Sequence, residues 1–386
     1  MLQAGARDEL LRRGFTRRDL GRIAALLSGG ASLPLFSEAA LAQFSNLGRR
    51  LPPDAVRINA NENPEGPCAA ALEACIRVAR DGGRYQYLEA AELAELVAQQ
   101  ESVESGQVLV YPGSSLALHH AVIAFTSPEK PLVTADPGYE APAHAATFVG
   151  AKVVRVPLRG ASASHDIKAM LAGGENAGLF YVCNPNNPTG TVTPPEDIAY
   201  LVANKPAGAV VLIDEAYIHF SDEPASTRFV EAGADVVIAR TFSKIYGMAG
   251  LRAGFALGRP DLLGKLRSYM AGGLPVTAMA AAKASLLDPD VAPARKRRNA
   301  EIRSGVIAFL KRHGYACTPS VSNKFMVDTR RPASRVIAAM AEENVFIGRP
   351  WGSWPTHTRV TVGTAAEMQK FQSAFLRVME RIPERT

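Results

Sequence analysis

A series of short aliphatic and β-branched runs, spaced so that a helix fits between most neighbours, limits this chain to few folds. Such runs are typical of strands buried in a parallel sheet, and parallel strands need long crossover connections that are usually helical. The sequence therefore predicts an α/β fold. The strands are expected at residues 108–110, 132–134, 179–182, 210–213 and 236–239.

A polar cluster follows each of these runs. In an open α/β sheet, ligands bind at the carboxyl ends of the strands, so the clusters should converge on one crevice. They are Gly113-Ser-Ser115, Asp136-Pro-Gly-Tyr139, Asn184-Pro-Asn-Asn-Pro-Thr-Gly190, Asp214-Glu-Ala-Tyr217 and Thr241-Phe-Ser-Lys244. A lysine, an acid and a tyrosine at such positions suit pyridoxal phosphate (PLP). The lysine can form a Schiff base with an aldehyde, the acid can keep a pyridine nitrogen protonated, and the phenol can hydrogen-bond a ring oxygen.

The C-terminal third has a different pattern. A helical stretch at about 295–313 is followed by short strand candidates at 324–327, 345–347 and 358–362. A chain of 386 residues exceeds a single typical core, so a smaller α+β domain is expected here, with residues 44–70 wrapping back onto it. We predict a leader at 1–42, an arm at 43–74, a large domain at 75–275 and a small domain at 276–386.

The composition is that of an ordinary folded protein, with 47% hydrophobic and 21% charged residues. The net charge of +6 is too small to favour nucleic acid, and no basic stripe interleaved with aromatic residues is present. The cluster Arg295-Lys-Arg-Arg298 is predicted to be the exposed face of a helix. The four cysteines show neither a C-x-x-C pair nor metal-ligand spacing, so no metal site is predicted.

The N-terminal residues resemble a twin-arginine export signal. Arg17 and Arg18 precede a mildly apolar stretch at 23–36, and Ala40-Leu-Ala42 offers a small-residue cleavage site before Gln43. The stretch is too short and too rich in Gly and Ser to span a bilayer stably. A mature periplasmic protein that starts near Gln43 is expected; the alternative is a disordered arginine-rich tail on a cytoplasmic protein.

Five motifs together resemble the fold type I PLP-dependent aminotransferases, and among these the histidinol-phosphate aminotransferase branch. The resemblance runs from about residue 59 to 363, and its motifs stand in the order that the branch uses. They are Asn59-Ala-Asn-Glu-Asn-Pro64, Asn184-Pro-Asn-Asn-Pro-Thr-Gly190, Asp214-Glu-Ala-Tyr217, Ser243-Lys244 with Ala249-Gly-Leu-Arg252, and Arg359-Val-Thr-Val-Gly363. The resemblance implies a large domain with a mostly parallel seven-stranded sheet, a smaller α+β C-terminal domain, and a homodimer with shared active sites.

The resemblance also implies roles for individual residues around PLP. Lys244 would hold the cofactor covalently and then move a proton between the substrate Cα and the cofactor, helped by a pKa that burial and Arg252 lower. Asp214 would pair with the pyridinium nitrogen, while Asn187 and Tyr217 would hydrogen-bond the ring oxygen. Tyr139 would stack on the ring. The phosphate would be held by Gly113, Ser114, Ser115, Thr241, Ser243 and Arg252.

Further matches concern the dimer and the substrate. Tyr85 matches a tyrosine that reaches the phosphate in the neighbouring subunit, with Tyr87 as a competing assignment. Arg359 resembles the arginine that grips the substrate α-carboxylate through two parallel hydrogen bonds. Substrate contacts are also predicted for Arg349, Asn61 and Glu65.

The chain departs from the branch at Glu65, where a tyrosine near the substrate phosphate is common. A carboxylate there would repel a phosphate, so an unphosphorylated, cationic or polar amino acid is the expected substrate. Residues 271–276 also differ from the segment usual in the branch. Two alternatives stay open. One is a PLP-dependent decarboxylase or oxidase-type enzyme on the same fold, because sequence does not show which Cα bond would break. The other is a non-catalytic binding protein.

Overall fold

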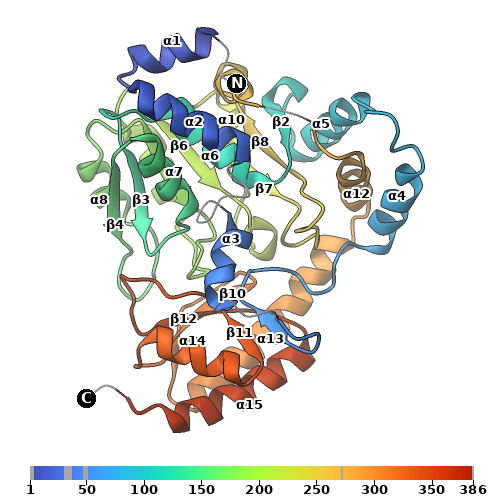
Figure 1. Cartoon of the computed structure of the whole chain (residues 1–386), viewed down its shortest axis with the longest axis vertical. Coiled ribbons are helices and arrows are strands. Elements are labelled where there is room, and N and C mark those ends of the chain that lie inside the picture. The colour runs from blue at the N-terminus through green and yellow to red at the C-terminus, as the bar shows by residue number, and fades with distance from the viewer. Residues whose placement is uncertain (1–3, 30–36, 47–50, 271–272, 385–386) are drawn as a thin grey trace.

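The computed structural model describes residues 4–29, 37–46, 51–270 and 273–384. Residues 30–36 of the predicted leader and residues 271–272 of the segment that departs from the branch lie outside this range. Within it the chain forms two domains that meet along a seam, with the small domain below the large one in Figure 1. Each domain has its own hydrophobic core.

The large domain is built on a mostly parallel sheet of seven strands, in the order β2-β8-β7-β6-β5-β3-β4. The predicted α/β fold is thereby confirmed. All five predicted runs are strands: β2 (Val108–Tyr111), β3 (Leu132–Asp136), β5 (Leu179–Cys183), β6 (Val210–Asp214) and β7 (Val236–Thr241). Two strands had not been predicted: β4 (Val153–Pro157) at one edge and β8 (Gly254–Gly258), which runs antiparallel to β2 and β7.

Helices connect these strands. They are α6 (Ser114–Phe125), α7 (Ala141–Val149), α8 (Ile167–Gly173), α9 (Pro195–Asn204) and α10 (Thr227–Glu231), and α11 (Pro260–Arg267) follows β8, the last strand of this sheet in the chain. Helix α6 starts right after β2 and packs against the middle of the sheet, so most of its residues are buried. Its N-terminus therefore faces the carboxyl ends of the central strands, where the polar clusters stand.

The small domain has a three-stranded antiparallel sheet, with β10 (Lys324–Asp328) between β12 (His357–Thr361) and β9 (Ala316–Cys317). A second, two-stranded sheet pairs β1 (Val56–Ile58) with β11 (Val345–Ile347), which ties residues 56–58 to this domain. Three helices cover the sheets: α13 (Val291–Arg312), α14 (Ala333–Glu342) and α15 (Ala365–Arg381). One expectation is corrected here, because Arg295 is buried and donates to the carbonyls of Ile245 and Gly66 instead of facing solvent.

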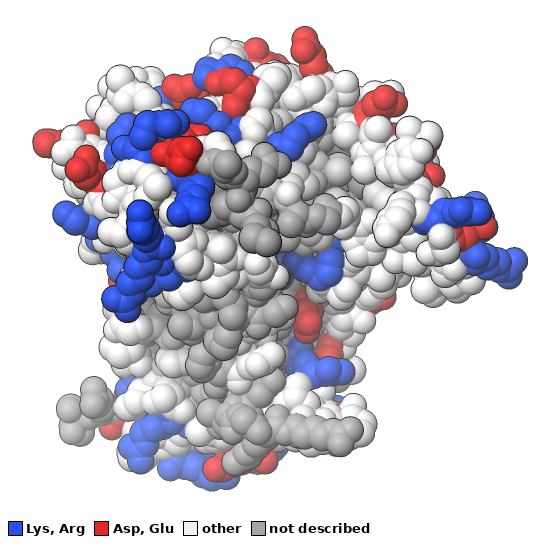
Figure 2. Space-filling model, turned by 45° about the horizontal axis from the view of Figure 1, so that its top comes forward, with Lys and Arg blue, Asp and Glu red and all other residues white. Residues whose placement is uncertain are grey.

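Three further helices form a projection at the right of Figure 1: α4 (Ala69–Ala79), α5 (Leu88–Glu101) and α12 (Val276–Leu287). Eight large apolar side chains are exposed among the described residues, and six of them lie on this projection. They are Leu72, Ile76, Tyr85, Tyr87, Leu88 and Leu287. We call this set the apolar flank. On the face drawn in Figure 2, Lys and Arg side chains are mixed with Asp and Glu, in keeping with the small net charge of +6.

The N-terminal helices are α1 (Ala4–Arg12), α2 (Arg17–Gly29) and α3 (Glu38–Ala42). Helices α1 and α2 lie across the top of the large domain in Figure 1, and Leu10, Ile23 and Leu26 are fully buried. Arg13 donates hydrogen bonds to the carbonyls of Ile123 and Thr126. Helix α3 lies at the seam between the two domains (Figure 1). No helix in the described part of the chain is long and apolar enough to cross a membrane.

Candidate active site

A cavity of roughly 490 Å³ opens at the carboxyl ends of β5, β6 and β7. Ten residues singled out in the sequence line it, namely Ser114, Ser115, Tyr139, Asn187, Asp214, Tyr217, Thr241, Ser243, Lys244 and Arg252. Glu38 and Glu62 line it as well. The structure therefore brings together side chains from five separate strand ends. Among the described residues no group of His, Cys, Asp or Glu is arranged to hold a metal ion.

Lys244 supplies a buried amine to this cavity. It stands in the loop after β7, is 7% exposed, and its Nζ donates to the carbonyl of Ala60 at 3.4 Å. Burial lowers the pKa of Lys244 to about 8, although the charges of Glu38 and Glu62 oppose that shift. Because a buried ammonium loses its hydration, the neutral and nucleophilic form of the amine is accessible near physiological pH.

Asp214 supplies a buried carboxylate at the end of β6. Its Oδ2 accepts a hydrogen bond of 2.8 Å from Tyr181 Oη, and its Oδ1 accepts one of 3.1 Å from the backbone N–H of Ala216. Burial raises the pKa of Asp214, and these two hydrogen bonds only partly offset that effect. Asp214 forms no ion pair with any residue in the described part of the chain. A buried carboxylate of this kind favours a cationic partner.

Arg252 supplies the opposite charge. Its Nη1 donates to the Ala249 carbonyl at 3.0 Å and to Ser243 Oγ at 3.3 Å, and no carboxylate pairs with it among the residues that the structure describes. Arg252 has a φ of +65°, a left-handed backbone that costs a non-glycine residue free energy and is common at functional sites. A guanidinium without an acid partner is suited to an anion.

Gly113 allows this arginine to approach the start of α6. A Cβ at Gly113 would stand 2.2 Å from Arg252 Nη2, and its φ of +81° also favours glycine. The Arg252 guanidinium and the free N–H groups of the first turn of α6 are thus close together. Backbone donors and the helix dipole favour negative charge there, so this end of the cavity can bind a phosphate.

Asn61 joins the two predicted ring-contacting side chains. Its Nδ2 donates to Tyr217 Oη at 3.0 Å and to Asn187 Oδ1 at 3.3 Å. Asn187 Oδ1 also accepts a hydrogen bond of 2.9 Å from Arg359 Nη1. The aromatic ring of Tyr139, which follows β3, is buried in the cavity wall. These contacts fix the side chains that surround the amine.

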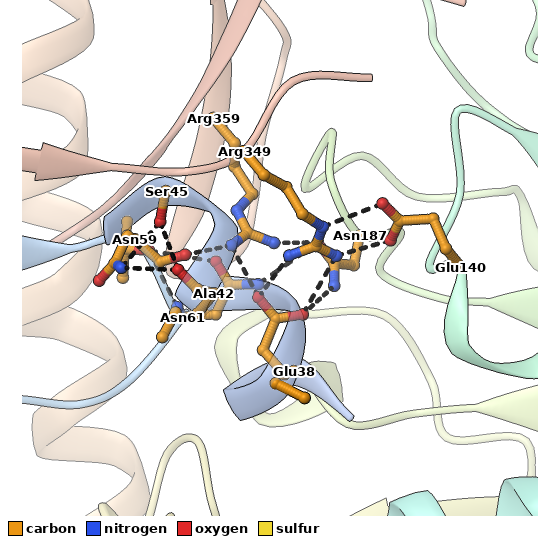
Figure 3. A network of polar contacts seen from close by, with 12 residues as sticks. Glu38, Ala42, Ser45, Asn59, Asn61, Glu140, Asn187, Arg349 and Arg359 are labelled. Carbon is orange, nitrogen blue, oxygen red and sulfur yellow. Dashed lines mark hydrogen bonds and ion pairs between the residues drawn. The ribbon is translucent and has the colours of Figure 1, made fainter. Parts of the chain in front are cut away.

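Two arginines of the small domain reach Glu38 of the cavity wall at the seam, as Figure 3 shows. Arg359, on β12, is 0% exposed and pairs with Glu38 Oε1 at 2.7 Å through its Nη2. Arg349 pairs with Glu38 Oε1 at 3.1 Å and, on its other side, with Glu140 Oε2 at 2.6 Å. Burial raises the pKa of Glu38, but Arg349 and Arg359 outweigh that effect and lower it to about 2. Glu38 is therefore ionised and held by both arginines.

Three residues named from the sequence lie away from the cavity. Glu65 is instead in a neighbouring cavity of roughly 320 Å³, where Arg295 and Arg298 pair with its carboxylate, because the chain turns away after Glu62. Tyr85 is 94% exposed and Tyr87 is 80% exposed, and both lie on the apolar flank. Within one chain neither tyrosine reaches the cavity.

Sequence reasoning missed three residues of the site. Glu38 had been assigned to the leader, so it was not considered, and Tyr181 lies inside an apolar run that predicts only a strand. Lys324 opens β10 and is fully buried, with its Nζ 3.0 Å from the centroid of the Tyr217 ring and 2.9 Å from Ser322 Oγ. Burial holds the pKa of Lys324 well below its usual value. Its place in the motif Ser322-Asn-Lys324 gave no signal of this position.

Comparisons with known proteins agree with this geometry. Residues 53–375 match the family model "Aminotransferase class I and II". The chain is 35% identical over 329 residues to the histidinol-phosphate aminotransferase of Symbiobacterium thermophilum, covering 83% of this chain and 90% of that protein. It is 33% identical over 320 residues to the aromatic amino acid aminotransferase of Cutibacterium acnes, covering 81% of this chain and 90% of the relative.

Among solved structures, the chain resembles the histidinol-phosphate aminotransferase of Sinorhizobium meliloti in complex with pyridoxal-5'-phosphate. The TM-score is 0.80 and the sequence identity is 28%, with 91% of this chain and 96% of that chain covered. The likeness extends over both domains, because it covers nearly all of the described residues.

Proposed function

The chain belongs to the class I and II aminotransferase family, and from this premise we propose that it binds PLP and moves the amino group of an unphosphorylated amino acid to a 2-oxo acid. It is an aminotransferase of the histidinol-phosphate aminotransferase-like group, with relatives about 30–35% identical over most of the chain. The proposal concerns the cofactor in this chain, the substrate and the assembly.

One observation carries the cofactor assignment. Among the residues that the structure describes, the same cavity holds a buried carboxylate without an ion-pair partner, Asp214, a half-buried guanidinium without an acid partner, Arg252, and a lysine amine with a lowered pKa. PLP has a group for each of them: a ring nitrogen that can be protonated, a phosphate and an aldehyde. The donor set thus fits the cofactor in both charge and chemistry.

When bound, PLP supplies an electron sink for the electron pair that remains when a bond to the substrate Cα breaks. Asp214 would keep the ring nitrogen protonated, and Asn187 and Tyr217, which Asn61 links, would hydrogen-bond the ring oxygen. The Arg359 guanidinium holds the substrate carboxylate and so orients the Cα–H bond. Lys244 Nζ, whose neutral form is accessible, takes up the Cα proton and returns it.

The charges near Arg349 argue against a phosphorylated substrate. Glu140 already neutralises Arg349, and the exposed Glu62 lines the cavity, so a dianionic phosphate at the distal end of the substrate would face carboxylates, with no free cation among the described residues there to bind it. Such a juxtaposition costs several kcal/mol. The expected donor is therefore an amino acid with one carboxylate and a neutral or cationic side chain.

The apolar flank supports a homodimer with shared active sites. Six exposed large apolar side chains on one projection are unusual for a monomeric surface and typical of an interface. Tyr85 lies on this flank, 94% exposed, and in a dimer it can reach the phosphate end of the partner's cavity.

We further propose that residues 1–42 include a twin-arginine export signal and that the protein works in the periplasm. The support is the motif itself and the exposure of Arg17 and Arg18 at the start of α2, where a receptor could reach them. Fractionation of cells that produce the chain with Arg17 and Arg18 changed to Lys tests this, and retention in the cytoplasm is the expected result.

The test of the enzymatic function is a donor screen. The purified chain, loaded with PLP, is given a panel of amino acids and histidinol phosphate with 2-oxoglutarate, and keto acid, glutamate, CO₂ and peroxide are measured. Glutamate and keto acid from an unphosphorylated donor are expected. Histidinol phosphate as the best donor would contradict the substrate assignment, CO₂ or peroxide without amino transfer would favour a decarboxylase or oxidase, and failure to bind PLP would favour a non-catalytic protein.

A further inference from the structure

Glu38 occupies the place where a substrate carboxylate would bind. Its Oε1 lies 2.7 Å from Arg359 Nη2, and its Oε2 accepts a hydrogen bond of 3.4 Å from Asn187 Nδ2 (Figure 3). Arg359 and Asn187 are joined by their own 2.9 Å hydrogen bond, so they present donors to the same carboxylate. To Arg359 and Asn187, the side chain of a glutamate and the α-carboxylate of an amino acid present the same chemical group.

We propose that Glu38 is an internal ligand of the substrate carboxylate site, so that helix α3 must release Arg359 before an amino acid can bind. The proposal rests on the proposed function in one respect, which is that Arg359 is the arginine that holds the substrate carboxylate. It adds a competitor, supplied by residues 1–42 of the uncleaved chain, to that site, and cleavage before Gln43 would remove that competitor.

The ion pairs at the seam favour one carboxylate at Arg359 rather than two. Arg349 and Arg359 contribute two positive charges, and Glu140 and Glu38 contribute two negative charges, all of them largely buried. A second carboxylate beside Glu38 would leave one buried anion without a partner, which is costly. If Glu38 leaves, Arg349, Arg359 and Glu140 together carry one net positive charge, which the single carboxylate of an amino acid can neutralise.

The segment around Glu38 is positioned by contacts of its own. Ser37 caps α3 by accepting a hydrogen bond from the Ala40 N–H, and Leu41 and Ala42 are buried. The carbonyl of Ala42 accepts hydrogen bonds from Ser45 Oγ at 2.6 Å and from Asn59 Nδ2 at 3.3 Å. These contacts hold the helix at the seam and present Glu38 to the arginines at a high local concentration.

The contacts of α3 are nevertheless few enough to be reversible. Helix α3 has five residues, and an isolated helix of that length is not stable in water. Its position therefore depends on the ion pairs at one end and the Ala42 contacts at the other. A carboxylate in solution that takes Arg359 weakens the first of these two anchors, because only the ion pair between Glu38 and Arg349 then remains.

The main test uses the full-length chain loaded with PLP and its Glu38→Gln variant, which keeps the size of the side chain and removes its charge. The substrate affinity of a protein whose competent state is a minor fraction is reduced by that fraction. We expect the KM for the best amino donor to fall about tenfold in Glu38→Gln. An unchanged or raised KM would overturn the proposal; a rise confined to cationic donors would identify Glu38 as a permanent contact to their side chains.

A binding measurement without catalysis separates this inference from the proposed function. Propionate, a carboxylate without an amino group, is titrated into both proteins by calorimetry, and it should bind about tenfold more tightly to Glu38→Gln. Glu140→Gln is the matched control, because it also removes one negative charge beside Arg349 but leaves the Glu38–Arg359 pair in place, so its gain in propionate affinity should stay well below that of Glu38→Gln. Equal affinities for propionate in all three proteins would refute the internal ligand even if amino transfer is observed.

Amide hydrogen exchange measures whether helix α3 stays docked at the seam. Saturating propionate should increase amide exchange at Ala40, Leu41 and Ala42 in the unmodified chain, because α3 loses its ion pair with Arg359. Unchanged or slower exchange there would show that the carboxylate binds without displacing Glu38, and this would overturn the proposal. If no donor is converted by any variant while propionate behaves as expected, the proposed function fails and the internal ligand stands.

Discussion

The hydroxyl group of Tyr181 donates a 2.8 Å hydrogen bond to Oδ2 of Asp214. Tyr181 lies in the middle of β5, and β5 and β6 are paired neighbours, so the sheet itself fixes this contact. The bond lowers the pKa of Asp214 against the effect of burial and so favours the ionised carboxylate. It therefore supports the interaction that Asp214 would make with a protonated ring.

We predict that Tyr181→Phe weakens the binding of PLP without unfolding the protein. Loss of a hydrogen bond to a charged group is worth about 1.5–3 kcal/mol, equivalent to roughly a tenfold to hundredfold weaker cofactor affinity. Titration of cofactor-free protein with PLP, followed by absorbance, measures it. Tyr111→Phe is the matched control, since Tyr111 is equally buried and bonds to His120 outside the cavity. An equal loss of affinity in both variants would contradict the assigned role.

Lys244→Ala is expected to remove both activity and covalent attachment of the cofactor. Loss of a positioned acid–base group costs about 10²–10⁴ in rate, and here the attachment point is lost as well. Borohydride reduction followed by peptide mapping should label Lys244 in the unmodified chain and no residue in the variant. Lys324→Met removes the other buried amine near the site and should leave the label on Lys244; a label on Lys324 would disprove the assignment.

The pH dependence of cofactor capture follows from the lowered pKa of Lys244. The neutral amine is the nucleophile, so capture by cofactor-free protein should increase as pH rises through about 8, where an ordinary lysine would require about 10.4. Removal of the negative charge in Glu38→Gln should shift the midpoint to lower pH, because Glu38 raises the pKa of Lys244. Rates of borohydride-stable adduct formation measure both. A midpoint near 10 would contradict the burial of a functional amine.

The lowered pKa of Lys244 also makes the stability of the cofactor-free protein depend on pH. The pKa of Lys244 is lower in the folded chain than in the unfolded one, so the unfolded state binds more protons between about pH 8 and 10.4. The free energy of unfolding of cofactor-free protein should therefore gain a favourable contribution from this residue as pH rises through that window. Lys244→Met should remove this pH-dependent contribution, and denaturant unfolding at several pH values measures the difference.

Arg359→Lys should raise the KM for amino donors far more than it changes kcat. A lysine cannot form the two parallel hydrogen bonds that a guanidinium gives to a carboxylate, and Arg359 is fully buried, where a lost contact is not replaced by water. We expect roughly a hundredfold increase, equivalent to about 3 kcal/mol. If KM changes by less than about twofold, then Arg359 does not hold the substrate carboxylate.

Tyr85→Phe tests the shared active site. Although Tyr85 is 94% exposed in one chain, loss of its hydroxyl should weaken PLP binding several-fold if it reaches the partner's phosphate. Tyr200→Phe is the control, since Tyr200 is exposed on α9, away from the apolar flank. Leu72→Glu should in addition shift the protein to monomers in size-exclusion chromatography. A dimer that resists this change, together with unaltered PLP affinity in Tyr85→Phe, would place the interface elsewhere.

The strands that could be predicted are those whose residues are apolar on both faces, and the two missed strands show why. Strand β4 is at the edge of the sheet, and Arg155 faces solvent there, so its run is interrupted by a charge. Strand β8 begins and ends with glycine, as Gly254 and Gly258 pack against neighbouring backbone where a Cβ would not fit easily. Both patterns resemble loops when only hydrophobic periodicity is considered.

The part of the candidate site that could be predicted consists of residues that directly follow strands. Residues placed directly after a strand converge because parallel strands end at one edge, and this applies to Asp214 and Lys244. Contacts made across large sequence distances left no such signal. Glu38 and Arg359 are 321 residues apart, and only the docking of the N-terminal segment at the seam brings them together.

Two lysine amines are buried near each other in this protein, yet only one lines the cavity. The aromatic face of Tyr217 packs against the Lys324 amine, with 3.0 Å between the ring centroid and Nζ. The amine also donates a hydrogen bond to Ser322 Oγ. An electrophile that enters the cavity therefore meets a single reactive nitrogen. The phenol ring thus provides chemical selectivity, since it shields a second nucleophile that would otherwise compete for the same carbonyl carbon.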